Sequence, residues 1–191
     1  MSKSESGLGS LSRRTVLLGG LSAGLITSIP GPASPAVLRG KGSFRSLKVI
    51  NKRTSERLNT VYWVEGQYIP EALEAFYYML RDWRQEQMIR IDTRTIDIMA
   101  AVYKLVETSE PLEIISGYRS PRTNAMLRSR SRGVARNSYH MRGQAVDLTL
   151  KSRSVGQMAA AARSLRAGGV GRYSRSHFVH VDSGPVRDWG R

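Results

Sequence analysis

The sequence contains no cysteine, and this absence excludes several kinds of site at once. Disulfide bridges, a thiol nucleophile and cysteine-ligated zinc cannot occur. Any transition-metal site must therefore be built from histidine and carboxylate side chains. A chain of 191 residues with 40% hydrophobic residues is nevertheless long enough to fold around one core without disulfides.

Long apolar runs are also missing, so the sequence contains no ordinary transmembrane helix. A shorter apolar run, residues 17–29, follows the pair Arg13-Arg14 and precedes small residues and prolines. These are the parts of an export signal, and the paired arginines favour the twin-arginine route. An ordinary Sec signal that carries two arginines is the alternative. We predict that residues 1–36 are an export signal and that the protein is periplasmic. Cleavage after Ala33 or Ala36 would fit, but the sequence leaves open whether the leader is removed or kept as an anchor.

Histidine is scarce, and its three occurrences fall in two short β-like runs. His140 lies in the run 139–150, which also carries Asp147, and His177 and His180 lie in the run 176–182. If the two runs lie side by side, His140, Asp147 and His180 can bind one tetrahedral zinc ion and leave a fourth position open for water, as catalytic sites do. Unrelated polar groups of the surface or core are the alternative.

A third motif, Ser116-Gly117-Tyr118-Arg119-Ser120, follows an expected strand at residues 112–116. Loops at strand ends often present functional side chains. The permanent charge and forked donors of Arg119 suit an oxyanion or a substrate carboxylate, with a structural salt bridge as the alternative.

These motifs together resemble the zinc peptidases that cleave D-amino-acid bonds in bacterial cell walls, the lysostaphin, D-Ala-D-Ala metallopeptidase and hedgehog group. Within the group the sequence is most similar to the YcbK-like (MepK) murein endopeptidases. Four segments carry the resemblance, which covers most of the chain after the leader: 116–120, 127–147, 166–173 and 178–189.

The resemblance implies an exported metallopeptidase that hydrolyses peptide cross-links of peptidoglycan, with one zinc ion per chain and zinc-bound water as the nucleophile. It places Arg119 in the active site as a catalytic and substrate-binding residue. We further predict that Tyr118, Ser120 and Ser138 contact the substrate. A D,D- or L,D-carboxypeptidase and a non-catalytic, zinc-containing cell-wall-binding module remain alternatives, and the sequence leaves open which bond is cut.

The general base is where the sequence departs from its relatives, several of which place a Glu three residues before the last ligand. His177 holds that position here and can transfer protons near neutral pH. Residues 177 and 180 would face opposite sides of a flat strand, so a bulge is required, and a surface-loop histidine is the alternative. Asp182 shares a strand face with His180 and is predicted to orient that ligand, unless it is a turn residue.

Acidic residues are few, 15 against 30 Lys and Arg, so the formal net charge is +15. A basic surface attracts polyanions. For an exported protein we expect stem-peptide carboxylates and the negatively charged envelope to be the partners, with no nucleic acid. The arginine-rich stretch 128–142 is expected to form a basic lip over the site, or else a solvated charged surface.

Periodicity predicts a single α+β domain in which helices pack against a small antiparallel sheet that carries the zinc site. Residues 37–68 are expected to form an N-terminal hairpin extension that caps or lengthens the sheet of a zinc peptidase domain at 69–191. Strands are expected at 46–50, 58–64, 112–116, 145–150, 170–173 and 178–181, and helices at 70–87, 93–107, 123–130 and 154–166.

Overall fold

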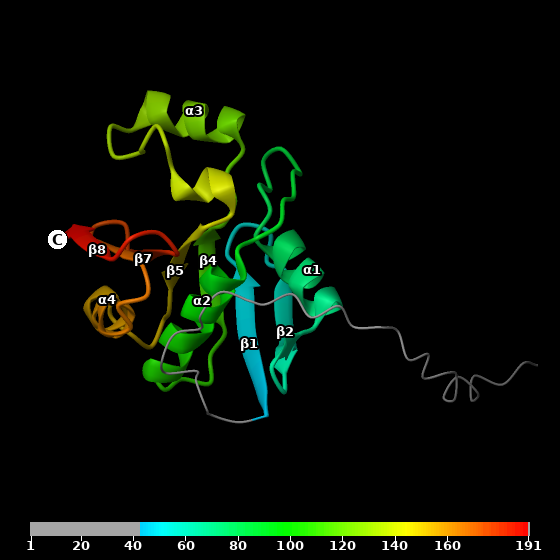
Figure 1. The fold of residues 1–191 in the computed structure, drawn as a ribbon. Coiled ribbons are helices and arrows are strands. Elements are labelled where there is room, and N and C mark those ends of the chain that lie inside the picture. The colour runs from blue at the N-terminus through cyan, green and yellow to red at the C-terminus, as the bar shows by residue number, and fades with distance from the viewer. Residues whose placement is uncertain (1–42, 191) are drawn as a thin grey trace, which may run out of the picture.

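A computed structural model describes residues 43–190, so the predicted export signal lies outside the described residues. One eight-stranded sheet forms the centre of this part of the chain (Figure 1). Its strands, in the order β3-β2-β1-β4-β5-β7-β6-β8, are Gln67–Tyr68, Arg57–Val64, Phe44–Asn51, Leu112–Ser116, Ala145–Thr149, Phe178–Asp182, Gly169–Tyr173 and Arg187–Gly190. The predicted single α+β domain is confirmed, but the sheet is larger than expected and mixed, because β1 with β4 and β6 with β8 pair in parallel.

The helices are α1 (Pro70–Met79), α2 (Thr93–Leu105), α3 (Pro121–Arg130) and α4 (Val155–Ser164). Their beginnings follow the local sequence, since Asp92 caps α2, Ser120 caps α3 and Ser154 forms a capping box with Gln157 at α4. Between residues 43 and 190 no helix has the length and apolar character needed to cross a membrane.

Helix α1 is shorter than predicted, because it ends at Met79 and not near residue 87. The guanidinium group of Arg81 binds Glu56 in the turn between β1 and β2 and Glu86 in the turn that follows Arg81, and the backbone pairs Asp82 with Gln87. These contacts replace the last helical turns. The aromatic periodicity had extended the predicted helix through this turn.

The hairpin of β1 and β2 belongs to the same sheet, because β1 pairs in parallel with β4. Asp97 of α2 is completely buried beneath this hairpin. Its carboxylate accepts hydrogen bonds from Arg45 at 3.1 Å, Tyr62 at 2.9 Å and Tyr68 at 2.8 Å. Helix α2 is thereby joined to all three strands β1, β2 and β3.

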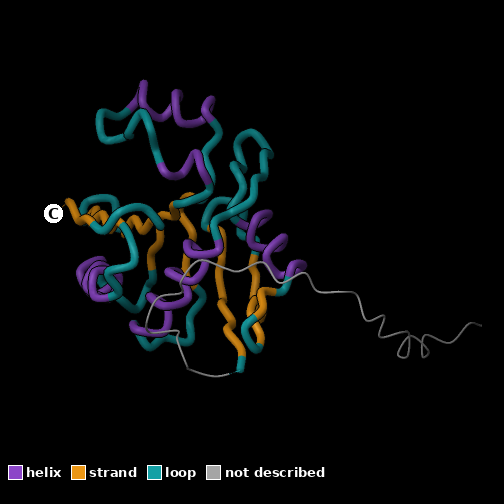
Figure 2. Tube along the Cα trace, viewed as in Figure 1, coloured by secondary structure: helices purple, strands orange, loops and turns teal. Residues whose placement is uncertain are grey.

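The two faces of the sheet differ in chemistry at its centre. Val146 and Leu148 of β5, with Val179 and Val181 of β7, belong to the apolar core, which also contains α2 and α4 side chains such as Met99. Because side chains alternate along a strand, the intervening residues of β5 and β7 lie on the opposite face. Figure 2 shows α3 and the short helical turn after it set apart from the other helices, beyond one end of the strands.

The structure has one more strand after residues 178–181, which the sequence predicted to be the last strand. The chain continues into β8, which pairs in parallel with β6 and matches Gly171 with Trp189. This strand brings the C-terminal aromatic and basic side chains beside β7.

Candidate metal centre

Asp147 and His180 are direct cross-strand neighbours in the antiparallel pair β5 and β7. Both lie on the face of the sheet opposite the apolar core, since their strand neighbours enter that core. Side chains at directly paired positions lie close together. The pairing register therefore places one carboxylate beside one imidazole.

His140 reaches the same point from a 3-10 turn, Tyr139–Arg142, which immediately precedes β5. The Ser138 side chain caps this turn by accepting a hydrogen bond from the His140 N–H group at 3.3 Å. Gly143 ends the turn with a φ of +65°, and a Cβ atom there would lie 2.6 Å from the Arg90 carbonyl oxygen. The glycine therefore permits the chain to fold His140 back over the strand.

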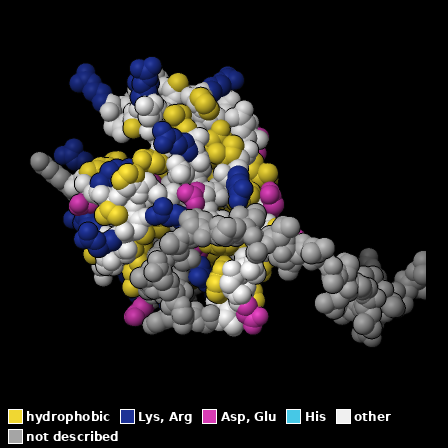
Figure 3. All heavy atoms as spheres, in the orientation of Figure 1, with side chains coloured by type: hydrophobic (Ala, Val, Ile, Leu, Met, Phe, Trp, Pro, Cys, Tyr) yellow, Lys and Arg dark blue, Asp and Glu magenta, His cyan; other side chains and the backbone are white. Residues whose placement is uncertain are grey.

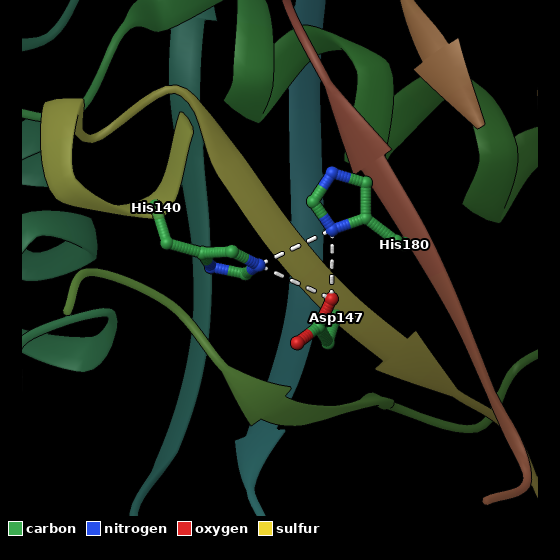
Figure 4. Close-up of side chains that lie close together, drawn as sticks. All are labelled: His140, Asp147 and His180. Atoms are coloured by element: carbon green, nitrogen blue, oxygen red, sulfur yellow. Dashed lines mark hydrogen bonds and ion pairs between the residues drawn. The ribbon is translucent and has the colours of Figure 1, made fainter. Parts of the chain in front are cut away.

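The three side chains converge on one point, as Figure 4 shows. His140 Nε2 lies 3.2 Å from His180 Nδ1 and 3.3 Å from Asp147 Oδ1, and His180 Nδ1 lies 2.9 Å from Asp147 Oδ1. All three residues are buried, and they form a group that can hold a metal ion. This is the trio that the sequence proposed as ligands.

The outer hydrogen bonds fix which ring nitrogen of each histidine faces the centre. His140 Nδ1 lies 2.7 Å from the Gly117 carbonyl oxygen and so donates to it, which leaves Nε2 free to accept. His180 Nε2 lies 3.0 Å from Asp182 Oδ2, which leaves Nδ1 at the centre. Carbonyl and carboxylate partners of this kind orient metal-binding histidines. Asp182 is fully buried and also binds Arg187.

Arg119 holds the other oxygen of the Asp147 carboxylate, Oδ2, through its Nη2 atom, and its Nε donates to Ser116 Oγ at 2.8 Å. The loop that carries Arg119 packs tightly, since a Cβ atom on Gly117 would lie 2.4 Å from the Leu80 carbonyl oxygen. The Ser120 N–H group also donates to Asp82 at 2.9 Å. Arg119 is thus both in the site and part of a salt bridge, so the two readings of its role are compatible.

Burial and mutual attraction shift the pKa values of the cluster in different directions. Burial lowers the pKa of His140. Burial by itself would raise the pKa of Asp147, but His140, His180 and Arg119 outweigh it and hold that pKa far below the usual range. Burial would likewise lower the pKa of His180, but its hydrogen bonds to Asp147 and Asp182 outweigh burial and raise it. The carboxylate is therefore ionised and ready to bind a cation.

A cavity of about 370 Å³ opens over the cluster. Of the predicted site residues, Arg119, Ser138, His140, Asp147 and His180 line it. Residues of the loop after α3 form another part of its lining: Ser131, Gly133, Val134, Ala135 and Asn137.

Three predicted site residues lie elsewhere. Tyr118 and Ser120 are buried beside the cavity lining and not part of it, and the Ser120 hydroxyl caps α3. His177 is exposed at the end of the β6–β7 turn with a φ of +54°, and it lines a separate hollow with Lys151 and Arg172. Strand β7 begins only at Phe178, so the bulge that would bring His177 to the face of His180 is not formed.

Sequence reasoning missed an aromatic and basic part of the cavity wall. Tyr173 and Phe178 stack with ring centroids 4.5 Å apart, and Trp189 Nε1 donates to the Tyr173 hydroxyl at 2.9 Å. The Trp189 ring lies 5.3 Å from the His180 ring. Only the aromatic residues near the second histidine run hinted at this wall, because the parallel pairing of β8 is not visible in the sequence.

Comparisons with known proteins identify the family of the chain. The family profile described as peptidoglycan L,D-endopeptidase MepK matches residues 40–189. Peptidoglycan L,D-endopeptidase MepK of Escherichia coli (strain K12) is 39% identical over 93% of this chain and 96% of its own length. A probable peptidoglycan L,D-endopeptidase MepK of Haemophilus influenzae is 37% identical over 93% of this chain and 94% of its own length. The chain therefore belongs to the MepK family of peptidoglycan endopeptidases.

Proposed function

We propose that the protein is an exported zinc metallopeptidase that hydrolyses peptide cross-links in bacterial peptidoglycan. The observation that carries the proposal is the buried trio His140, Asp147 and His180, whose three inner atoms lie at the corners of one small triangle. Family membership supports hydrolysis of peptidoglycan.

The trio suits zinc in both chemistry and size. Two imidazole nitrogens and one carboxylate oxygen are a common catalytic zinc set, and ligand bonds near 2.0–2.1 Å in a tetrahedron place ligand atoms about 3.3 Å apart. The observed separations of 2.9–3.3 Å agree with that spacing. The ion would be held by His140 Nε2, Asp147 Oδ1 and His180 Nδ1. When bound, zinc acidifies a water molecule and polarises the scissile carbonyl group.

Arg119 has two roles in this proposal. Its Nη2 atom holds Asp147 Oδ2, so that Oδ1 is the carboxylate atom turned toward the two imidazoles. Neither this bond nor the bond from Nε to Ser116 uses Nη1, and Arg119 lines the cavity. In the proposed reaction Nη1 would donate to the carbonyl oxygen of the substrate as negative charge develops on it.

His177 receives no role in the reaction, because it lies outside the cavity. Among the described residues that line the cavity, His140 and His180 are the only histidines and no glutamate is present. The two phenolic hydroxyls of the lining, on Tyr139 and Tyr173, remain as further proton-bearing groups beside the substrate.

The names of the relatives specify L,D-endopeptidase activity, so an L,D cross-link is the bond to test first. Residues 1–36 are proposed to direct export by the twin-arginine route to the periplasm, where this substrate is found. The basic surface would also favour association with the negatively charged envelope.

The test is digestion of isolated peptidoglycan by the purified protein, with the released fragments separated by mass. We expect new un-cross-linked peptides that disappear with a chelator and return with zinc. A His140→Ala variant is the control, since it removes one donor from the trio. Loss of a single terminal residue without loss of cross-links would support the carboxypeptidase, and bound zinc with no change in any fragment would support the binding module.

A further inference from the structure

Helix α3 and the loop that follows it, residues 121–137, form a basic segment that we call the arginine arm. It contains Arg122, Arg128, Arg130, Arg132 and Arg136, and the sequence has no acidic residue between Glu113 and Asp147. Figure 1 shows α3 standing away from the sheet, and Figure 3 shows Lys and Arg side chains gathered over it.

The charge on this arm is not neutralised within the described part of the protein. All five arginines are exposed, and none forms an ion pair with a described carboxylate. The two arginines that line the cavity are by contrast paired, since Arg119 binds Asp147 and Arg187 binds Asp182. The arm therefore carries positive charge beside the cavity that no described carboxylate neutralises.

The loop of the arginine arm forms part of the cavity wall. Asn124 of α3 is 2% exposed, and its Nδ2 group donates to the carbonyl oxygens of Ala135 at 3.1 Å and Arg136 at 3.4 Å. These bonds tie the loop to its own helix. The loop is thus held in place where it faces the metal centre.

Two of the arginines are interleaved with the residues that line the cavity. Arg132 stands between Ser131 and Gly133, and Arg136 stands between Ala135 and Asn137, all four of which line the cavity. Arg132 and Arg136 are themselves exposed and do not line the cavity, so the backbone at each borders the cavity while the side chain is open to solvent. Arg122 lies in the first turn of α3, at the other end of the arm.

We propose that Arg132 and Arg136 form a carboxylate-recognition rim that selects acidic stem peptides and positions them over the metal centre. The inference rests on the proposed function, in which the substrate carries free carboxylates near the cross-link. Guanidinium groups bind carboxylates through paired donors, and neither group has to break an internal ion pair to do so. Opposite charge would also speed the encounter of enzyme and substrate.

Equilibrium binding of a soluble, un-cross-linked peptidoglycan fragment tests the rim without requiring turnover. The zinc-loaded full-length protein is titrated with the fragment in its natural form and with its carboxyl groups amidated. The test variant is Arg132→Gln/Arg136→Gln. One control, Arg122→Gln/Arg128→Gln, removes the same charge from the same arm. The second, Arg53→Gln/Arg57→Gln, removes it from the exposed N-terminal hairpin.

We expect the rim variant to bind the natural fragment about five- to twentyfold more weakly, since each exposed contact contributes a factor of up to about five. The amidated fragment should bind all four proteins equally. A loss of the same size in the Arg122/Arg128 control would overturn the rim, because the effect would then be a general attraction. Unchanged binding of the natural fragment by the rim variant would also overturn the rim. The same holds if, in a parallel titration, the rim variant loses binding only to anionic phospholipid vesicles.

Failure of the rim and failure of the proposed function give different results. A protein that cleaves peptidoglycan but binds the fragment independently of Arg132 and Arg136 refutes the rim alone. A protein that shows rim-dependent binding but releases no fragments supports recognition and refutes hydrolysis. Thermal unfolding of each variant checks that the exposed substitutions leave the fold intact.

Discussion

His180 Nε2 lies 3.0 Å from Asp182 Oδ2, and both oxygens of Asp182 are in turn held by Arg187 at 3.0 and 2.7 Å. Arg187, Asp182 and His180 thus form a chain of hydrogen bonds that leads from the cavity wall to the candidate metal centre. Because Asp182 fixes one nitrogen of the imidazole, the other nitrogen is presented to Asp147 and His140. This chain of hydrogen bonds therefore determines that Nδ1 is the atom of His180 that can bind a cation.

An Asp182→Asn substitution should weaken zinc binding about 10- to 100-fold, because the buried partner of a ligating histidine orients its ring and raises its basicity. Competition with a chromophoric chelator measures the affinity. Asp188→Asn is the matched control, since Asp188 is a largely exposed carboxylate in an ion pair with Arg163. Equal zinc affinities for the two variants would contradict the orienting role.

Zinc binding near pH 6.5 should release one proton, and that proton should come from His180. Burial lowers the pKa of His140, so this ring is already neutral, whereas Asp147 and Asp182 outweigh burial and raise the pKa of His180. Zinc must displace the proton from His180, so its affinity should increase as the pH rises toward the raised pKa.

The raised pKa of His180 also predicts how the stability of the zinc-free protein depends on pH. A raised folded-state pKa means that charged His180 stabilises the fold below its unfolded value of about 6.5, and that this contribution disappears as the pH rises through the folded pKa. The number of protons released on zinc binding is measured by titration calorimetry in two buffers of different ionisation enthalpy. Release of two protons, or an affinity independent of pH, would disprove this assignment.

A His177→Ala variant should retain activity on peptidoglycan within about twofold, because surface substitutions away from a site have small effects. His177 lies in a separate hollow and outside the cavity that holds the trio. A His180→Ala variant, changed three residues away in the same segment, should lose activity altogether. A hundredfold loss of kcat in the His177 variant would restore that residue as the general base.

An Asp97→Ala variant should unfold about 3–5 kcal/mol more easily, because the substitution removes the carboxylate that the buried Arg45 guanidinium group binds. The hydroxyls of Tyr62 and Tyr68 would lose the same acceptor. Urea denaturation measures the difference. Glu110→Ala, which changes a carboxylate at the surface after α2, should have little effect, and comparable losses in both variants would show that the buried cluster is not what holds α2 to the sheet.

The convergence of His140, Asp147 and His180 could be predicted from sequence for a physical reason. Histidine is rare in this chain and cysteine absent, so few ligand sets exist. Strand alternation then places Asp147 and His180 on one face, and Gly143 permits the turn that returns His140. Each step depends on local geometry that neighbouring residues determine.

The sequence did not determine which side chains surround the trio, because that depends on contacts between distant segments. His177 satisfied the spacing expected for a base, yet the β6–β7 turn ends in a left-handed conformation and leaves it in another hollow. Trp189 and Arg187 enter the cavity wall only because β8 pairs in parallel with β6. Residue type and local spacing thus specified the candidate ligands, whereas strand pairing and loop packing, which no short stretch of sequence encodes, decided which side chains line the cavity.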